Sequence, residues 1–473
     1  MKVRGTAHLL GLLATLLLCS RSLPAQELPD AGQLHVETTQ WLASLVRIDT
    51  TSATGNELAA ARYIAGILEK DGIAAELLEV APGRSAVVAR LRSSALPDPA
   101  RALLLAGRLD TAGVDRAKWT VDPFGGIIKD GYLYGRGTVE GKGMLVANLA
   151  ALIALKRSEA RLNRDVIFLA ATDGEGGGEA GIQTLIAKYW DRLAAGYALN
   201  EGGDVIVKDG KAQQVAIQAN EKVAYTVRVV ASGSASRVSV PPKDNAVTHL
   251  AEAMARISSY NPPAHPTAMV RRYFEQIALV EEPFAAKWMR VLDSPDRAEH
   301  AARVLSDLNP LWNAMLHDTV CPTAMQTGPG TNEIPAEALA TVSIRLLPGD
   351  SIDAVLADLE KLVNDPKIRL ELAEPGKIAA PPSALDNDFY RTIEQTGARE
   401  FPGAAVVPFL SPWATDSAQL RLHSVQAYGL LPFPLTEEDL GRAGGNDERI
   451  PLDALDRGVL FLYRIVAKFA ATL

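Results

Sequence analysis

The chain has 473 residues, which is enough for two or three domains or for one large domain with an insertion. Hydrophobic residues make up 48% and charged residues 22%, a composition that excludes a largely disordered, collagen-like or coiled-coil chain. The net charge of −8 leaves no basic footprint for nucleic acid or anionic lipid, so we expect no nucleic-acid partner and favour a small-molecule or peptide ligand.

The first residues differ in character from the rest of the chain. Lys2 and Arg4 precede an apolar run over residues 9–18, which is too short for a membrane span and is typical of a secretory signal peptide. We expect a signal peptide over 1–25, cleaved after Ala25, and therefore an exported protein, periplasmic or secreted. No later stretch approaches the ~20 consecutive apolar residues of a transmembrane helix, so no membrane span is expected.

The two cysteines bear on the same question. A lipoprotein signal ending at Cys19 is the second interpretation of the N-terminus, and it is disfavoured because Leu18 is bulkier than the residue that usually precedes such a cysteine. After cleavage at Ala25 only Cys321 remains. No intramolecular disulfide can then form, so stability must come from burial of apolar surface.

Apolar patterning predicts the elements of the first half of the chain. It is helical over 34–68 and then alternates short apolar runs with helical stretches. The runs SAVVARL, ALLLAGRLD, VIFLAATD and YALNE are typical of strands buried on both faces, with helices expected over 144–157 and 181–189. This alternation predicts an α/β domain with a largely parallel sheet and helices on both faces.

The pattern changes near residue 220. The strand-like runs VAYTVRVVA, TVSIRLLPG and IRLELAE accompany helices expected over 245–257 and 352–363, an order that favours a small ferredoxin-like α+β sheet with helices on one face. A helical insertion over 268–314 interrupts it.

The first pattern returns after the proline-rich linker IAAPPSALD, with helices expected over 388–397 and 455–471. We therefore predict one α/β domain formed by 30–215 and 379–473, into which an α+β domain over 216–378 is inserted.

Acidic residues follow several of the predicted strands. They are Asp110, Glu140 in the turn LYGRGTVEGKG, Asp173, Glu175 and Glu201. Each one alone is most simply a helix cap or a solvated loop residue. Because functional groups of open α/β sheets gather beyond the carboxyl ends of strands, we expect these acids to converge, and converging carboxylates repel unless a cation or protons compensate them.

A glycine-rich turn follows one of these strands. Gly176, Gly178 and Gly181 satisfy G-x-G-x-x-G between a strand and a helix, with Glu201 twenty residues further on, which is the dinucleotide-binding pattern of nucleotide-dependent oxidoreductases. We disfavour this function because two glutamates in the segment would place negative charge beside a pyrophosphate. A flexible strand-to-helix turn is the preferred interpretation.

A set of ordered motifs carries a family resemblance over about residues 35–470. They are WTVDPF, DGYLYGRG followed by Lys142-Gly143, the TD-x-E-x-GG-x-x-G turn, NEGG, VPPKDNAV, GPGTNEIP, SIRLLPG, TDS, AYGLLP and GNDERIP. With these motifs the chain resembles the dizinc metallopeptidases and amidohydrolases of peptidase family M20, which include aminoacylase, glutamate carboxypeptidase and succinyl-diaminopimelate desuccinylase. The resemblance implies a catalytic α/β domain, an inserted lid and dimerisation domain, a homodimer, zinc, and hydrolysis of peptide or N-acyl amide bonds.

Some site positions implied by the resemblance are retained. Asp110 matches the aspartate that orients a zinc-binding histidine, and Glu140 takes the place of the bridging aspartate. Glu175 matches a zinc ligand, and Glu201, with Asn200 beside it, matches the fourth acidic ligand.

The other positions depart from the family. Arg108 stands at the first histidine ligand, Gly174 at the general-base glutamate, Gly444 at the last histidine ligand and Arg237 at the lid histidine. The seven histidines of the chain all lie outside the motif positions. Zinc prefers imidazole or thiolate donors, so we expect no stoichiometric zinc, with weak calcium or magnesium binding allowed.

Arg108 brings a permanent positive charge to the position of a metal. We expect its guanidinium to pair with Glu175 or Glu201 and to replace the charge of the metal. Without a general base, whose assistance is typically worth about 10²–10⁴-fold in rate, hydrolysis by the family mechanism should fail.

Two lid residues match substrate-holding positions of the family. Asn332 in GPGTNEIP and Arg345 in SIRLLPG are associated there with the substrate or its carboxylate. For Arg345, a structural ion pair within its own domain is an equal alternative. The sequence thus favours an exported, catalytically degraded family member that retains a peptide or amino-acid ligand. The alternative is a residual metal-dependent hydrolase of peptide or N-acyl amide bonds with an altered metal site.

Overall fold

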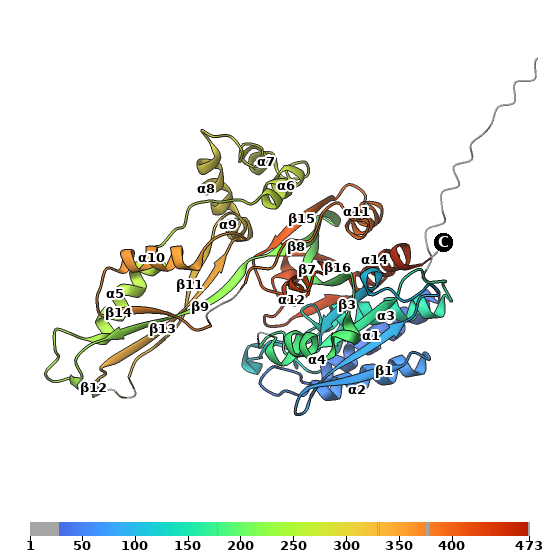
Figure 1. The fold of residues 1–473 in the computed structure, drawn as a ribbon, viewed down its shortest axis with the longest axis horizontal. Coiled ribbons are helices and arrows are strands. Elements are labelled where there is room, and N and C mark those ends of the chain that lie inside the picture. Colours follow the sequence, from blue (N-terminus) through green and yellow to red (C-terminus); the bar gives the residue numbers. More distant parts are fainter. Residues whose placement is uncertain (1–27, 177, 329, 331, 375–377, 472–473) are drawn as a thin grey trace, which may run out of the picture.

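A computed structural model describes residues 28–471 apart from 177, 329, 331 and 375–377. The predicted signal peptide over 1–25, with Cys19, lies outside the described residues. No helix in the described part of the chain is long and apolar enough to cross a membrane. Figure 1 shows the two largest sheets, each with its own helices, side by side along the longest axis.

A mixed eight-stranded sheet forms the larger part of the molecule. From edge to edge its strands are β1 (Ala75–Ala81), β2 (Arg84–Leu91), β6 (Val166–Ala171), β3 (Leu103–Arg108), β7 (Tyr197–Lys208), β16 (Gln426–Thr436), β8 (Lys211–Glu221) and β15 (Ala405–Ser411). The central strands β6, β3, β7 and β16 are parallel to one another, whereas β1 and β2 join antiparallel at one edge. The expected α/β fold with a mostly parallel central sheet is confirmed.

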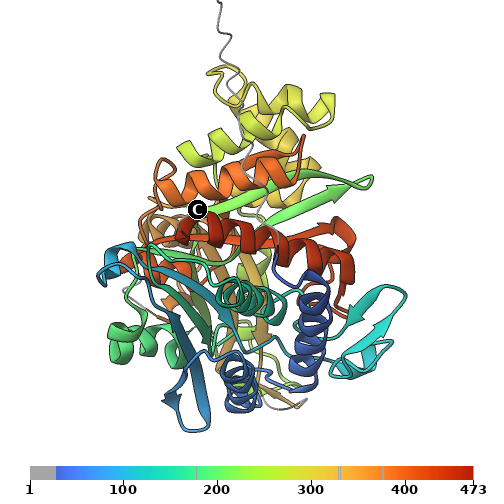
Figure 2. The ribbon, with the colours of Figure 1, turned by 90° about the vertical axis from the view of Figure 1, so that its right-hand side faces the viewer.

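Helices cover both faces of this sheet. One face carries α1 (Ala31–Arg47), α2 (Glu57–Lys70), α3 (Lys142–Arg157), α11 (Asp388–Glu400) and α14 (Leu452–Ala470), whose apolar side chains form one core with the strands. Figure 2 shows α1, α3 and α14 packed together on this side. The other face carries α4 (Thr184–Leu193) and α12 (Ser417–Leu422), which form a second core.

Short elements connect these layers. They are the 3-10 turns η1 (Pro99–Arg101) and η2 (Arg116–Lys118), the π-helical turn η3 (Glu179–Gln183), the helix α13 (Glu437–Leu440), and a small sheet of β17 (Arg449–Pro451), β5 (Tyr132–Tyr134) and β4 (Ile127–Lys129). Gly181 has φ −137° and ψ −121°, so the regular helix expected from 181 begins at Thr184 instead.

The inserted domain has an antiparallel four-stranded sheet in the order β11-β13-β9-β14. In chain order its elements are β9 (Val223–Ser232), β10 (Ser236–Arg237), α5 (Ala246–Ser258), β11 (Thr319–Gln326), β12 (Glu333–Ile334), β13 (Glu337–Leu346), α10 (Ile352–Val363) and β14 (Ile368–Leu372). Helices α5 and α10 pack against one face through an apolar core. The order βαββαβ is the expected ferredoxin-like arrangement.

One boundary differs from the sequence expectation. Strand β8 belongs to the larger sheet through Glu221, so the change of sheet comes at Lys222 rather than at 216. The helical insertion consists of α6 (Ala268–Ile277), α7 (Pro283–Met289), α8 (Ala298–Leu308) and α9 (Pro310–Leu316). These helices share a core with β15 and β8, because Phe274 and Trp312 pack in one cluster with Phe409, and they thereby cover the edge of the larger sheet.

Candidate functional site

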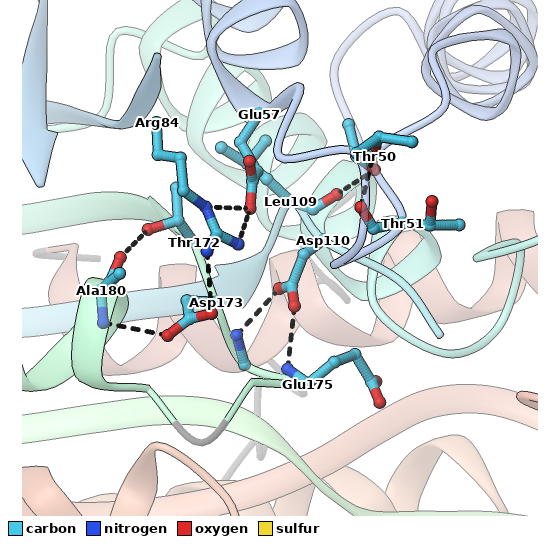
Figure 3. Close-up of polar contacts among 12 residues, drawn as sticks. Thr50, Thr51, Glu57, Arg84, Leu109, Asp110, Thr172, Asp173, Glu175 and Ala180 are labelled. Atoms are coloured by element: carbon cyan, nitrogen blue, oxygen red, sulfur yellow. Dashed lines mark hydrogen bonds and ion pairs between the residues drawn. The ribbon is translucent and has the colours of Figure 1, made fainter. Parts of the chain in front are cut away.

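The carboxyl ends of β3 and β6 bring the first predicted site residues together. The strands are parallel neighbours with Arg108 opposite Ala171, so the segments after both strands meet at one edge. Asp110 is fully buried there, and its carboxylate accepts hydrogen bonds from the backbone N–H groups of Gly174 (3.0 Å) and Glu175 (2.8 Å; Figure 3). Asp110 therefore fixes the turn that carries Gly174 and Glu175.

Arg108 occupies the centre of the acidic cluster. Its residue exposure is only 6%, and its guanidinium contacts Glu175 at 2.5 Å, Glu201 at 2.7 Å and Glu140 at 3.5 Å. Both partners predicted for it, Glu175 and Glu201, are engaged. Burial disfavours its charge, but the carboxylates of Glu201 and Glu175 outweigh burial and hold the pKa of Arg108 well above its ordinary value.

The acids around Arg108 are partly removed from water. Burial raises the pKa of Glu140 to about 7, Arg108 opposes the rise, and Glu175 and Glu201 add to it. Burial is also the main cause that raises the pKa values of Glu201 and Asp110. One arginine thus compensates only part of the negative charge.

Sequence reasoning missed a further acid in this cluster. Asp416 precedes α12, and burial followed by the charge of Glu201 raises its pKa to about 7. The segment TDS that contains it was among the matched motifs, so the signal was present, but no strand end or ligand spacing distinguished Asp416 from its neighbours.

Two glycines occupy the positions at which a general base and a histidine ligand were expected from the sequence to be absent. A Cβ atom at Gly174 would lie 2.2 Å from Cδ of Arg108, and a Cβ atom at Gly444 would lie 2.3 Å from Oε2 of Glu140. Both positions, which the sequence resemblance assigns to a general base and a metal ligand, therefore face the Arg108 cluster. The space that side chains would need at Gly174 is filled by Arg108.

A second charge network lies beside the site. Arg84 donates to Glu57, which is fully buried at the start of α2, and to Asp173 at 3.0 Å (Figure 3). Asp173 adopts a left-handed φ of 59°, and its backbone O and Oδ2 accept from the N–H groups of Gly178 and Ala180. These two N–H groups of the glycine-rich turn donate to Asp173 and are therefore not presented to a phosphate.

The turn that carries Glu140 is fixed by a buried glutamate from the motif GNDERIP. Glu448 accepts hydrogen bonds from the N–H groups of Gly137, Val139 and Glu140 at 2.9–3.0 Å, and it pairs with buried Arg136 at 2.8 Å. This pair ties the segment before α14 to the segment before α3, and so positions Glu140 beside Arg108.

The three residues predicted to hold a ligand from the lid, Arg237, Asn332 and Arg345, belong to the inserted domain. Arg237 and Asn332 are exposed and adjacent, because β10 pairs with β12 and the N–H of Val238 faces the backbone oxygen of Asn332. Arg345 lies near the opposite end of β13, opposite Ala224, and it has no ion-pair partner among the described residues. Desolvation lowers its pKa and the charge of Glu221 opposes that effect.

In the part of the chain that the structure describes, no group of three or more His, Cys, Asp or Glu side chains is arranged to hold a metal ion. His249, His265 and His35 instead face carboxylates far from the Arg108 cluster in sequence, and the Nδ1–H of His317 donates to the backbone oxygen of Pro262.

Comparisons with known proteins agree with the motifs. Residues 104–468 match the sequence model of peptidase family M20/M25/M40. The chain is 28% identical over 383 residues to probable carboxypeptidase S-like 2 of Dictyostelium discoideum, covering 78% of this chain and 72% of that protein. It is 27% identical over 370 residues to the N-fatty-acyl-amino acid synthase/hydrolase PM20D1 of Homo sapiens (77% and 73%) and 27% identical over 331 residues to probable succinyl-diaminopimelate desuccinylase of Staphylococcus aureus (70% and 73%).

Solved structures share the fold. An M20 family metallo-carboxypeptidase from Sulfolobus solfataricus superposes with a TM-score of 0.69 at 18% identity, covering 92% of this chain and 99% of that chain. Human carnosine dipeptidase 1 gives a TM-score of 0.68 at 16% identity, covering 93% and 98%.

Proposed function

Because the chain belongs to peptidase family M20/M25/M40, we propose that it is an exported pseudo-hydrolase, which keeps the family framework and a binding site for a peptide or N-acyl amino acid but has lost zinc-dependent hydrolysis. The ligand class is suggested by the activities for which two relatives are named, an N-fatty-acyl-amino acid synthase/hydrolase and a desuccinylase, which act on acylated amino groups. Export rests on the N-terminal sequence pattern alone.

The single observation that carries the loss of hydrolysis is the position of Arg108. Its guanidinium already contacts all three remaining ligand carboxylates, Glu140, Glu175 and Glu201. A metal ion among them would meet a buried positive charge, and the donor set contains no imidazole or thiolate. These residues do not fit a pair of zinc ions.

The loss of the general base supports the same conclusion. Gly174 has no side chain to accept a proton from water, and Arg108 occupies the space in front of it. Arg108 itself cannot act as a base, because a guanidinium has no acceptor and stays protonated. The cluster can hold charges and orient a bound group, but it lacks a base at the family's position.

One observation favours the alternative of a residual hydrolase. The side chain of Glu140 is 43% exposed, and its pKa is raised to about 7, so near neutral pH it can exchange a proton with a bound water. In that alternative, Glu140 replaces the missing base and a weakly held hard cation replaces zinc.

The test uses the mature full-length chain. After dialysis, elemental analysis should find far less than one zinc per chain, and assays on N-acyl amino acids and dipeptides should show no hydrolysis, whereas calorimetry with the same compounds should show saturable binding. Two tightly held zinc ions per chain would contradict the proposal. Slow hydrolysis that is lost in Glu140→Gln would establish the residual hydrolase instead.

A further inference from the structure

A histidine in the inserted domain lies between two carboxylates. Nδ1 of His249, in the first turns of α5, is 2.6 Å from Asp365, and Nε2 is 3.1 Å from Asp244. Asp365 belongs to the turn between α10 and β14, and Asp244 precedes α5. The ring therefore links the segment at the start of α5 to the turn before β14, which is 116 residues away in the chain.

The rest of the cluster closes around the same two carboxylates. Lys367 contacts Asp244 through Nζ at 3.2 Å and donates its backbone N–H to Asp365 at 2.9 Å. Ser234 donates its hydroxyl to Asp244 at 3.1 Å, and Arg256 of α5 adds a positive charge near Asp365. These are the charged and polar groups that face the imidazole and its partners within the described residues.

This cluster holds the base of an arm. Residues 234–244 leave the sheet after β9 and return to α5, and the two ends of the arm meet because the N–H of Ser234 donates to the backbone oxygen of Asp244. The arm carries β10 with Arg237, and its pairing with β12 places Arg237 next to Asn332. Two of the three lid residues thus depend on how firmly the base of the arm is held.

We propose that His249 is a pH-sensitive clamp, which holds the 234–244 arm while its ring is doubly protonated and releases the arm when the ring becomes neutral. An imidazolium donates from both nitrogens and can serve both carboxylates. A neutral imidazole has one N–H, so its other nitrogen faces a carboxylate with no proton between them. The longer contact, to Asp244 at the base of the arm, is then the one that opens.

The sign of the pH dependence follows from the surroundings. The hydrogen bond to Asp365 raises the pKa of His249, desolvation opposes it, and Asp244 adds to the rise. The contacts of Asp244 with Lys367 lower the pKa of that carboxyl, so it stays ionised. The clamp is fully closed below the ordinary histidine pKa of 6.5 and is lost as pH rises through the raised value.

Limited trypsin digestion of the full chain tests the clamp. Arg237 is exposed, so cleavage of the 237–238 bond reports opening of the arm, and cleavage after exposed Arg92 serves as the internal reference for trypsin's own pH dependence. The ratio of the two rates should rise several-fold from pH 6 to pH 8.5 in the wild-type chain. In His249→Gln the ratio should be high at both pH 6 and pH 8.5, because a glutamine side chain does not become protonated as the imidazole does.

Two further variants separate the clamp from general loss of structure. His265→Gln removes a histidine that pairs with Asp350 elsewhere, and it should leave the wild-type ratio unchanged. Asp365→Asn should move the midpoint of the ratio to lower pH, and histidine-selective NMR should show the same downward shift for the His249 ring. An unchanging ratio in the wild-type chain, or the same pH dependence in His249→Gln, would overturn the proposal.

Discussion

A single guanidinium determines what the carboxylates of the site can do. Arg108 donates hydrogen bonds and carries a fixed charge, so it keeps Glu175 and Glu201 close together without repulsion. It cannot polarise a carbonyl group as a Lewis acid or lower the pKa of a bound water, which are the contributions of zinc to hydrolysis. Under the proposed function, the same acids therefore remain in place while zinc-dependent hydrolysis is lost.

Reversal of the site residues should restore zinc only when they change together. Gly174→Glu alone places a side chain against Arg108, and we expect it to destabilise the fold by about 1–3 kcal/mol through overpacking. Gly444→His alone adds a Cβ at φ 67° beside Glu140, a strain of about 1–2 kcal/mol. The combination Arg108→His, Glu140→Asp, Gly174→Glu and Gly444→His removes the obstructing guanidinium and completes the ligand set.

Zinc content and amide hydrolysis of each single variant beside the combined one are the measurements. We expect bound zinc in the combined variant alone, and full activity only with Arg237→His added, because residues that act as one unit are strongly non-additive. Substantial hydrolysis from Gly174→Glu alone would mean that the wild-type site already holds a working metal. A combined variant that folds but binds no zinc would mean that the residues around the site no longer position the ligands for zinc.

Individual contacts of the site were predictable where sequence motifs fixed the partners. The pairing of Arg108 with Glu175 and Glu201 was predicted because all three residues match metal-ligand positions of the family. The participation of Asp416 did not, because it depends on how α12 is placed against the sheet, and sequence patterns carry no such long-range distance.

Between elements, the buried pair of Glu448 and Arg136 should be the most sensitive contact. Glu448→Ala leaves Arg136 buried without its counter-charge and frees three backbone N–H groups, so we expect a loss of about 3–5 kcal/mol in the free energy of unfolding. Urea denaturation measures this loss.

A matched control is Glu299→Ala, which removes an exposed pair with Arg303 on α8 and should change the free energy of unfolding by less than about 1 kcal/mol. Equal effects of Glu299→Ala and Glu448→Ala would contradict the structural role of Glu448.

The bounds of helices could be predicted from the sequence, whereas the pairing of strands was harder to predict. Helix α10 spans the expected 352–363, and α5 differs from 245–257 by one residue at each end, because amphipathic periodicity marks both helices and an asparagine N-cap also marks the start of α5. The sequence pattern did not assign all of strand β8 to the larger sheet, because β8 pairs with β15 and β16, which are distant in sequence. The packing of α6–α9 on β15 was likewise outside any local pattern.

At the scale of the whole molecule, the two sheets place the predicted ligand residues far apart in the fold. The Arg108 cluster belongs to the larger sheet, whereas Arg237 and Asn332 lie on the arm and β12 of the inserted domain (Figure 1). A ligand that touches both sets requires either closure of the two domains or a second copy of the chain that supplies the arm.

We expect the chain to form a homodimer through the inserted domain. Strand β11 is an edge of the four-stranded sheet, so one side of it offers unpaired backbone groups, and Met325 on it is 50% exposed. Sedimentation equilibrium at micromolar concentration should give twice the mass of the chain. Met325→Glu should shift the protein toward monomer, because it places a charge on this edge, whereas Leu96→Glu, at a residue 91% exposed on the larger domain, should leave the mass unchanged. A wild-type chain that stays monomeric would leave domain closure as the one way to bring Arg237 to the Arg108 cluster.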